Sequence, residues 1–322
     1  MGRGERPVST VETMVKSEAP IDVLVPHEAG VAALADVPGV RAIRYDPAAD
    51  LPSEAETAQV LVAPFQATGE VVARLGQLPK LRMVQLLTAG AEAWIGKLPD
   101  GVALSDGRGA HGGATAEWIV AALLAVYRHV PRFVTAQAEG RWDYHQTEEL
   151  ADKRVLIVGA GDVAENTVAR LAPFGVTTTL VGRRARDGVH AIEDVQDLLP
   201  HHDACVLIVP LTGATRGLVD AAFLAAMPEG AVLVNAARGP VVDTNALVAE
   251  LTSGRLRAAL DVTDPEPLPA GHPLWNAPGL FLAPHVGGSV PQATARAFRV
   301  AAEQIAEFAE GNTPPNLVQD GY

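Results

Sequence analysis

Residues 154–170 read RVLIVGAGDVAENTVAR, and this stretch decides the fold class. Val155–Val158 contains no polar residue, which is typical of a central parallel strand covered on both faces. The turn Gly159-Ala160-Gly161 follows this strand directly, and a helical segment continues through Arg170. A strand, a glycine turn and a helix in this order predict one unit of a doubly wound parallel sheet.

Apolar runs that alternate with helical stretches or Gly/Pro breaks extend this pattern in both directions. Downstream they are Thr178–Val181, Ala204–Val209, Ala231–Val234, Ala258–Leu260 and Leu280–Leu282. Upstream they are Ile21–Val25, Val40–Tyr45, Val60–Val62, Leu81–Leu87 and Val102–Leu104. We therefore predict an α/β protein with a doubly wound parallel-sheet (Rossmann) cofactor domain and a smaller flavodoxin-like α/β substrate domain.

A chain of 322 residues is long enough for two compact domains. The last helical stretch, about Pro291 to Glu310, has no strand after it, so we expect it to return to the first unit. The predicted organisation is a disordered tail over 1–18, a discontinuous substrate domain over 19–107 and 289–322, and a dinucleotide-binding domain over 108–288. Between the two, Thr115 to His129 predicts a buried or interface helix.

Composition excludes several kinds of partner. The formal net charge of -13 repels nucleic acid and anionic membrane surfaces. No apolar stretch is long enough to span a bilayer, and the first eighteen residues have no apolar centre typical of a secretory signal. The single cysteine, Cys205, lies in an apolar run and fits a reducing compartment, so we expect a cytoplasmic protein. The pair His201-His202 has no evident third ligand, and we interpret both as solvated and predict no metal site.

The turn Gly159-Ala160-Gly161 has the spacing of a dinucleotide-binding turn. The first glycine permits the tight turn, and the second lets the backbone approach a pyrophosphate. Ala164 is the third small residue, which allows close packing of helix on strand. The helix that follows offers free N–H groups to phosphate, although a plain tight turn has the same sequence features.

The end of the second strand indicates which dinucleotide binds. NAD sites carry Asp or Glu there to hold the ribose 2′-OH, whereas this strand runs into Gly182 with Arg183 and Arg184 behind it. Gly182 leaves room where the carboxylate would lie, and a guanidinium suits a 2′-phosphate. We therefore expect NADP(H) in preference to NAD, the alternative being a solvated basic turn.

Three later segments each place an ionisable residue just after an apolar strand. Arg238 follows Val234, Glu266 follows Leu260, and His285 follows Ala283. Strand ends converge on the ligand crevice of an open parallel sheet, so these side chains are candidates for hydride-transfer chemistry. Taken singly, each residue fits an ion pair, a cap or simple packing equally well.

Together these motifs resemble the D-isomer-specific 2-hydroxyacid dehydrogenase family over about Ile21 to Asn316, closest in kind to NADP-preferring glyoxylate/hydroxypyruvate reductases. The matching stretches are Val84–Gly90, Ala116-Glu117, Trp142 with Glu149-Leu150, the glycine turn, Pro210–Thr212 with Thr215–Gly217, and the three segments that carry Arg238, Glu266 and His285. Two departures are Ala164 for the family's third glycine and Gly182-Arg183 where NAD-using members carry Asp.

The resemblance implies a role for each matched residue. Arg238 would bind the substrate carboxylate and polarise the C2 carbonyl, His285 would be the acid/base, and Glu266 would orient the imidazole and favour its protonated form. The implied substrate-binding residues are Thr88, Ala89, Gly90, Arg238 and His285. The implied cofactor-binding residues are Thr115, Gly159, Gly161, Asp162, Val163, Arg183, Arg184, Val209, Pro210, Thr215, Ala236, Asp261 and Gly287.

The resemblance also implies a small anionic 2-oxo or 2-hydroxy acid as substrate and a homodimer in which Trp142 lies near the subunit boundary. His111, on the connection between the domains, is a further residue that could face the substrate. Two alternatives stay open. A phosphite-type dehydrogenase uses the same three residue types, and a corepressor-like NAD(P)-sensing protein keeps the fold without turnover. The sequence does not indicate which 2-oxo acid is used or the physiological direction.

Overall fold

The computed structural model describes residues 19–65 and 69–319, and the predicted disordered tail over 1–18 lies outside them. The chain divides into two compact units: unit 1 is Met1–His111 with Pro291–Tyr322, and unit 2 is Gly112–Val290. The predicted boundaries, after residues 107 and 288, lie four and two residues before these. Each unit is described by itself below.

Unit 1 contains a parallel sheet of five strands in the order β2-β1-β3-β4-β5, which is the flavodoxin-like order. The strands are β1 (Ile21–Val25), β2 (Val40–Arg44), β3 (Ala58–Val62), β4 (Met83–Gln85) and β5 (Ala103–Ser105). The helices are α1 (Glu28–Leu34), α2 (Gly69–Arg74) and α9 (Ala293–Ala309). Helix α9, which is encoded after unit 2, therefore completes unit 1, as the last helical stretch predicted.

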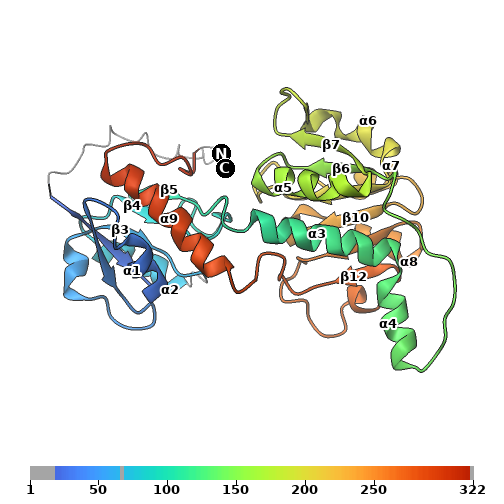
Figure 1. Cartoon of the computed structure of the whole chain (residues 1–322), viewed down its shortest axis with the longest axis horizontal. Coiled ribbons are helices and arrows are strands. Elements are labelled where there is room, and N and C mark those ends of the chain that lie inside the picture. The colour runs from blue at the N-terminus through green and yellow to red at the C-terminus, as the bar shows by residue number, and fades with distance from the viewer. Residues whose placement is uncertain (1–18, 66–68, 320–322) are drawn as a thin grey trace, which may run out of the picture. The chain divides into compact units, whose positions relative to one another are not determined.

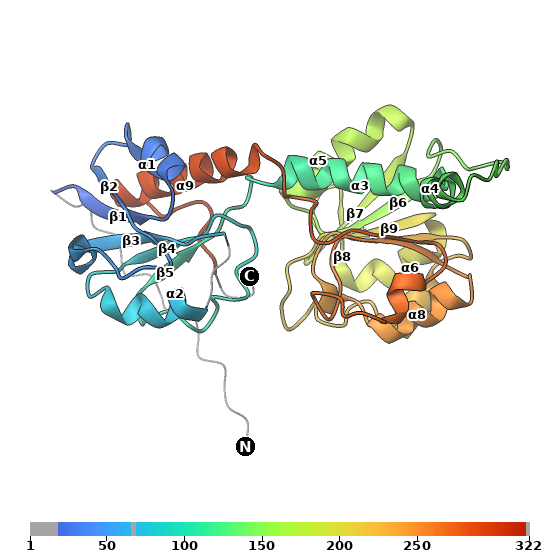
Figure 2. The same cartoon turned by 90° about the horizontal axis from the view of Figure 1, so that it is seen from below.

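Helices cover both faces of the unit 1 sheet (Figures 1 and 2). Phe298 and Ile305 of α9 pack with Val23 and Val60 in one core cluster, which α1 also joins. Val71 of α2 belongs to a separate cluster on the other face. Burial on both faces explains why β1 is apolar except for Asp22, whereas the edge strand β2 carries Arg41 and Arg44 and has no buried residue.

Unit 2 contains a parallel sheet of seven strands in the order β12-β11-β10-β9-β6-β7-β8. The strands are β6 (Arg154–Val158), β7 (Thr177–Gly182), β8 (Val189–Ala191), β9 (Ala204–Leu207), β10 (Val232–Asn235), β11 (Arg257–Leu260) and β12 (Leu280–Leu282). The helices are α3 (Gly112–Tyr127), α4 (Val130–Ala138), α5 (Asp162–Leu171), α6 (Val195–Leu198), α7 (Ala221–Ala226) and α8 (Thr244–Thr252). The predicted fold class is confirmed, and β8 and α4 are elements that the sequence pattern did not indicate.

The central strand β6 shows why this unit folds as it does. Val155 and Ile157 pack against α3 and α5, whereas Leu156 and Val158 pack against the helices of the opposite face, among them α7 and α8. Successive side chains of a strand point to opposite faces, so an unbroken apolar run matches a sheet covered twice. Figure 2 shows the two helical layers above and below the strands.

No single helix in the part of the chain that the structure describes has the length and apolar composition needed to cross a membrane. Helices α3 and α4 reach the length together, but the chain bends by 66° at the break between them.

Candidate active site

The carboxyl ends of the parallel strands gather most of the predicted site residues of unit 2 along one edge of the sheet. Because all seven strands are parallel, the loops that follow them leave from the same edge. The topological switch point lies between β6 and β9, where ligands bind in open α/β sheets. The residues that follow β6, β7, β9, β10, β11 and β12 at this edge are Gly159, Gly161, Asp162, Val163, Arg183, Arg184, Val209, Pro210, Thr215, Ala236, Arg238, Asp261, Glu266, His285 and Gly287.

The glycine turn has the geometry that a pyrophosphate needs. Gly159 N donates to Val181 O at 2.8 Å, and a Cβ at Gly159 would lie 2.7 Å from Ile208 O, so no larger residue fits there. Gly161 caps α5 without a side-chain hydrogen bond, which leaves the first N–H groups of this ten-residue helix to an external anion. The turn therefore fits a dinucleotide.

The Asp162 carboxylate is directed towards the start of α3. Its Oδ1 accepts from Asn166 Nδ2 at 3.0 Å, and the Gly112 backbone N–H also donates to it. Burial, with a contribution from Glu165, raises the pKa of Asp162 above its ordinary value. Asp162 thus ties α3 to α5 through its side chain, and its backbone N–H is what it can offer to a phosphate.

The loop after β7 carries the predicted ribose-binding residues. Arg183 and Arg184 are exposed, and no carboxylate stands at the strand end. The room expected at Gly182 is smaller than predicted, because a Cβ there would lie 3.0 Å from Val189 Cγ1 on the unpredicted strand β8. The arginines and the missing acid still fit an adenosine ribose that carries a 2′-phosphate.

His285 and Glu266 form a direct pair: His285 Nδ1 lies 2.7 Å from Glu266 Oε1. Their side chains are 45% and 42% exposed, so both are open to a small ligand. His285 has a φ of 55°, an uncommon value for a residue with a side chain. A histidine that is held by a carboxylate and still open to solvent can exchange a proton with a bound substrate.

Asp261 holds the segment that carries His285. Its two carboxylate oxygens accept from Val286 N at 2.8 Å and from Gly287 N at 2.9 Å, and the His285 N–H donates to the Asp261 carbonyl at 2.7 Å. Burial raises the pKa of this carboxyl, and the two backbone donors oppose that effect. Because the residue is only 4% exposed, its carboxylate fixes the 285–287 turn; its role towards the nicotinamide stays a prediction.

Arg238 lies at the start of a short 3-10 helix, Gly239–Val241, and is half-buried. Its Nη1 donates to Ala237 O at 2.7 Å. The next residue, Gly239, packs against the loop that leads to Glu266: a Cβ there would lie 1.9 Å from Thr263 O. The two loops that carry Arg238 and Glu266 are therefore in direct backbone contact.

The remaining cofactor residues lie on the same edge or near it. After β9, Thr215 Oγ1 donates to Pro210 O at 2.6 Å, so the hydroxyl of Thr215 closes its own loop. Ala236 follows β10, and Thr115 lies near the start of α3. These positions fit a cofactor lining, but their contact with a dinucleotide stays a prediction.

In unit 1, Thr88, Ala89 and Gly90 follow β4 at the carboxyl edge of the sheet. Gly107 N donates to Thr88 O at 2.8 Å, which holds the loop. His111 belongs to this cluster, since its Nε2 lies 3.0 Å from Leu87 O. The structure thus brings His111 to the loop that the resemblance assigns to the substrate carboxylate.

One interpretation was wrong. His202, taken as solvated, is 5% exposed, with Nδ1 2.8 Å from Leu198 O and Nε2 2.9 Å from Thr179 Oγ1. Burial lowers the pKa of its imidazole. His202 is therefore a structural residue that joins the start of β9 to β7, and the neighbouring His201 is exposed as predicted.

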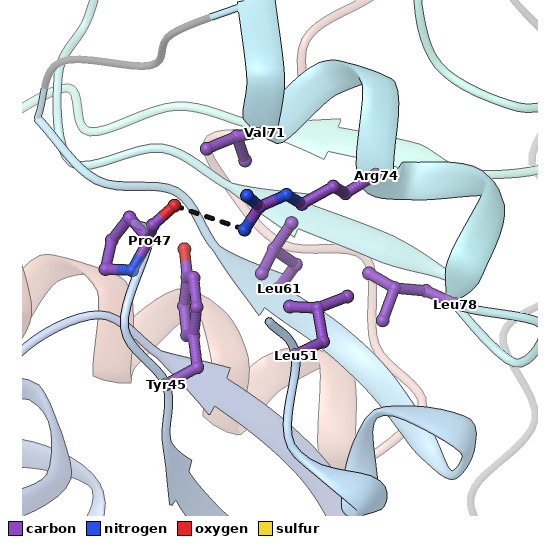
Figure 3. Close-up of a pocket in the computed structure, with 7 residues that line it drawn as sticks. All are labelled: Tyr45, Pro47, Leu51, Leu61, Val71, Arg74 and Leu78. Carbon is purple, nitrogen blue, oxygen red and sulfur yellow. Dashed lines mark hydrogen bonds between the residues drawn. The ribbon is translucent and has the colours of Figure 1, made fainter. Parts of the chain in front are cut away.

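Two hollows are lined by none of the predicted site residues. In unit 1, Tyr45 and Arg74 line a pocket of about 10 Å³, in which Arg74 reaches Pro47 O (Figure 3). A cavity of that size holds about one water molecule and cannot take a 2-oxo acid. In unit 2, an open hollow of about 510 Å³ is lined in part by Pro240 and Pro265, close in sequence to Arg238 and Glu266.

Comparison with known proteins places these features in a family. The model of the D-isomer specific 2-hydroxyacid dehydrogenase NAD binding domain matches residues 120–287, which is more than half of the chain. Glyoxylate reductase from Thermofilum pendens is 36% identical over 218 residues, and the match covers 64% of each chain, so it spans less than two thirds of that relative.

Solved structures agree over nearly the whole length. A D-isomer specific 2-hydroxyacid dehydrogenase from Xanthobacter autotrophicus Py2, in complex with NADPH and MES, is 30% identical with a TM-score of 0.80 and covers 94% of this chain and 98% of its own. The NADPH-dependent glyoxylate/hydroxypyruvate reductase from Sinorhizobium meliloti, in complex with NADP and sulfate, is 27% identical with a TM-score of 0.76 and covers 94% and 98%. With the glycine turn and the His285–Glu266 pair in place at the sheet edge, this chain belongs to the D-isomer specific 2-hydroxyacid dehydrogenase family.

Proposed function

We propose that this chain is an NADP(H)-dependent oxidoreductase that reduces a small 2-oxo acid, such as glyoxylate or hydroxypyruvate, to the D-2-hydroxy acid. The observation that carries the proposal is the 2.7 Å contact between His285 Nδ1 and Glu266 Oε1, on the same sheet edge as Arg238 and the glycine turn. A paired histidine can serve as acid/base, and an arginine can bind a carboxylate through two parallel hydrogen bonds.

The cofactor would be held by the glycine turn and the start of α5 at its pyrophosphate, and by Arg183 and Arg184 at its ribose. NADPH, when bound, supplies the hydride. The preference for NADP rests on the arginines and the missing carboxylate after β7. The Xanthobacter and Sinorhizobium relatives, which were solved with NADPH and NADP, support it.

The side chains of unit 2 would bind the substrate and transfer the proton. Arg238 binds the substrate carboxylate and polarises the C2 carbonyl. Glu266 keeps a proton on Nδ1 of His285, so Nε2 is the nitrogen that faces substrate. The imidazolium donates its Nε2 proton to the carbonyl oxygen. The neutral ring keeps its Nδ1 proton, which stays hydrogen-bonded to Glu266. The reverse direction returns the proton to Nε2.

The test is an absorbance assay at the nicotinamide band. Purified protein is mixed with NADPH or NADH and then with glyoxylate, hydroxypyruvate, pyruvate or phenylpyruvate. Oxidation that is faster with NADPH supports the reaction and the cofactor together, whereas faster oxidation with NADH contradicts the cofactor alone. Tight NADPH binding without oxidation by any acid contradicts the reaction; a parallel assay with phosphite and NADP then separates a phosphite-type enzyme from a cofactor-sensing binding protein.

We also propose a homodimer and a cytoplasmic location. Three apolar side chains on α4 and the loop behind it support the dimer: Val134 is 60% exposed, Trp142 94% and Tyr144 85%. Large exposed apolar groups gathered on one segment are typical of an interaction surface. Light scattering after gel filtration measures the mass, and Trp142→Ser should shift it towards the monomer.

A further inference from the structure

The arm over residues 141–149, between α4 and β6, presents its side chains alternately to α4 and to solvent. The side chains of Asp143 and His145 are 13% and 19% exposed. Trp142 and Tyr144, beside them in the sequence, are 94% and 85% exposed. Successive side chains of an extended chain point to opposite sides, so the two inward residues decide where the two outward rings lie. Figure 1 shows the chain turning at the end of α4 and running back towards its start before it enters β6.

Two side-chain contacts fasten the inward residues to α4. Asp143 accepts two hydrogen bonds from Arg132, at 2.6 and 3.0 Å. His145 Nε2 lies 3.0 Å from Nδ1 of His129, the residue that precedes α4. The ring of His145 also stacks on Phe133, with the ring centroids 4.8 Å apart. The middle of the arm is therefore tied to α4 by an ion pair and by a pair of imidazoles.

The hydrogen bonds of the imidazole pair limit how many protons it can carry. His145 Nδ1 lies 3.0 Å from Asp143 O, and a carbonyl oxygen only accepts, so this Nδ1 carries a proton. In the neutral pair His145 Nε2 is then an acceptor, and His129 Nδ1 donates to it. One added proton preserves the bond, because one of the two facing nitrogens still has a lone pair. With two added protons neither nitrogen can accept, and two cations face each other.

The surroundings of the imidazole pair oppose the second proton. The charged groups around it are Arg128 after α3, Arg132 on α4, Arg141, Asp143 and Glu148 on the arm, and Arg257 on β11. Burial lowers the pKa of His129 below its ordinary value of 6.5, and the neighbouring imidazole and arginines add to this effect. Arginines outnumber carboxylates around the pair, so a second positive charge is unfavourable there.

The carboxylates near the pair keep their charge over the range in which histidine titrates. A hydrogen bond from Arg132 lowers the pKa of Asp143 to about 2. Burial would raise the pKa of Glu148, but hydrogen bonds from Lys153 and Arg257 bring it below its ordinary value of 4.5. Between about pH 5 and 6.5 the imidazole pair is therefore the group that changes its charge at this junction.

We propose that the His129–His145 pair is a pH-sensitive fastening, which holds the arm at neutral pH and releases it when both rings are protonated. Its consequence for assembly rests on the proposed homodimer, because Trp142 and Tyr144 belong to the surface assigned to the partner. In the released arm each imidazole binds a proton near the ordinary value of 6.5, whereas the closed pair resists the second proton. The closed arm is therefore fully stable above about pH 6.5 and loses stability as the pH falls below it.

Hydrogen exchange of the arm measures the release directly. Peptides that span residues 144–148 are followed by mass spectrometry between about pH 7.5 and 5, with rates corrected for the intrinsic pH dependence of exchange. Release takes up one proton, so protection in wild type should fall by up to about tenfold per pH unit below 6.5.

Variants assign this pH dependence to the pair. His145→Gln removes one titrating ring, so its protection, whatever its level, should not change with pH. His129→Asn should behave in the same way, since asparagine tolerates the left-handed φ of 53° at this position. His201→Gln, which replaces an exposed histidine elsewhere in unit 2, is the matched control and should follow wild type.

Sedimentation equilibrium of the same proteins measures the effect on assembly. The dissociation constant of the wild-type dimer should rise at least about threefold from pH 7.5 to 5.5, because release of the arm withdraws Tyr144 from the proposed interface. The dissociation constant of His145→Gln should stay within about twofold over the same range.

The outcomes separate this inference from the proposed homodimer. If wild type is monomeric at every pH, the homodimer fails, and the exchange experiment still decides the role of the pair. If protection of the arm is independent of pH in wild type, or depends on it equally in His145→Gln, the fastening is overturned whatever the mass. If wild type releases the arm and stays equally dimeric, the link between the pair and assembly is overturned.

Discussion

Replacing Gly239 by alanine should displace Arg238 relative to the His285–Glu266 pair. The glycine turn after β6 should stay intact. The added Cβ would lie 1.9 Å from Thr263 O and 2.1 Å from Thr263 C, both backbone atoms that cannot rotate away. Ordinary contact begins near 3.4 Å, so the two loops must separate by about 1.5 Å. Arg238 immediately precedes Gly239, and Glu266 lies three residues beyond Thr263, so the shift changes their mutual placement.

A displacement of about 1 Å in a catalytic group can reduce the rate roughly 100-fold, which sets the expected loss of kcat for Gly239→Ala with a 2-oxo acid and NADPH. Overpacking should also destabilise unit 2 by about 1–3 kcal/mol, a fall of several degrees in its unfolding temperature. Affinity for NADPH should change little, because the glycine turn follows β6, two strands away from β10.

The assay compares kcat, NADPH affinity and thermal unfolding for wild type, Gly239→Ala and the control Gly76→Ala. At Gly76 a Cβ meets no atom within 4 Å, so this control measures alanine in place of glycine without a clash. Should Gly239→Ala keep kcat within about threefold of wild type, contact between the two loops would not be what positions Arg238. A parallel loss of NADPH affinity would indicate general damage to the unit and would equally refute the reasoning.

Three further predictions concern single side chains. His285→Ala should lower kcat roughly 100- to 10,000-fold with NADPH affinity nearly unchanged, and steady-state kinetics with near-normal kcat would contradict its acid/base role. Burial raises the pKa of the Cys205 thiol, so a thiol reagent should react with it only after unfolding, and rapid labelling of the native protein would be inconsistent with its position in the core. The hydrogen bond from Arg41 lowers the pKa of Asp22, so this pair stabilises unit 1 at neutral pH and loses its effect as pH falls below the ordinary value of 3.8. Thermal unfolding of Arg41→Gln should therefore lie about 1–4 °C below wild type at pH 7, the gap should narrow as the pH falls below 3.8, and a gap that widened in acid would refute the sign.

Strand positions were predictable where burial on both faces forces an apolar run. Val155–Val158 satisfies that condition, and its predicted strand is observed as β6 with Arg154 added. Strand β8 was not predicted, because Val189–Ala191 is a three-residue edge strand with exposed His190 at its centre. Helix α4 was missed because it follows the Ala/Leu-rich helix α3 almost directly. The break between the two helices is a left-handed turn at His129.

The types of residue at the site could be read from sequence because parallel strands share an edge. The distance between His285 and Glu266 could not, since it depends on a φ of 55° at His285 and on the two backbone bonds that Asp261 accepts. The hydrogen bond from Arg186 to Ala160 O was missed for a similar reason. The run from Gly182 to Arg186 contained the signal, but the hydrogen bond to Ala160 needs the fold of the loop.

The late position of α9 in the chain has a consequence for biosynthesis. Phe298 and Ile305 belong to the same core cluster as Val23 and Val60, so that face of unit 1 stays uncovered while the whole of unit 2 is translated. Unit 2, Gly112–Val290, is continuous and has its own core, and it can fold while α9 is still inside the ribosome. The unit that is started first is therefore completed last, and one face of its sheet lacks its helical cover until the end of α9 emerges.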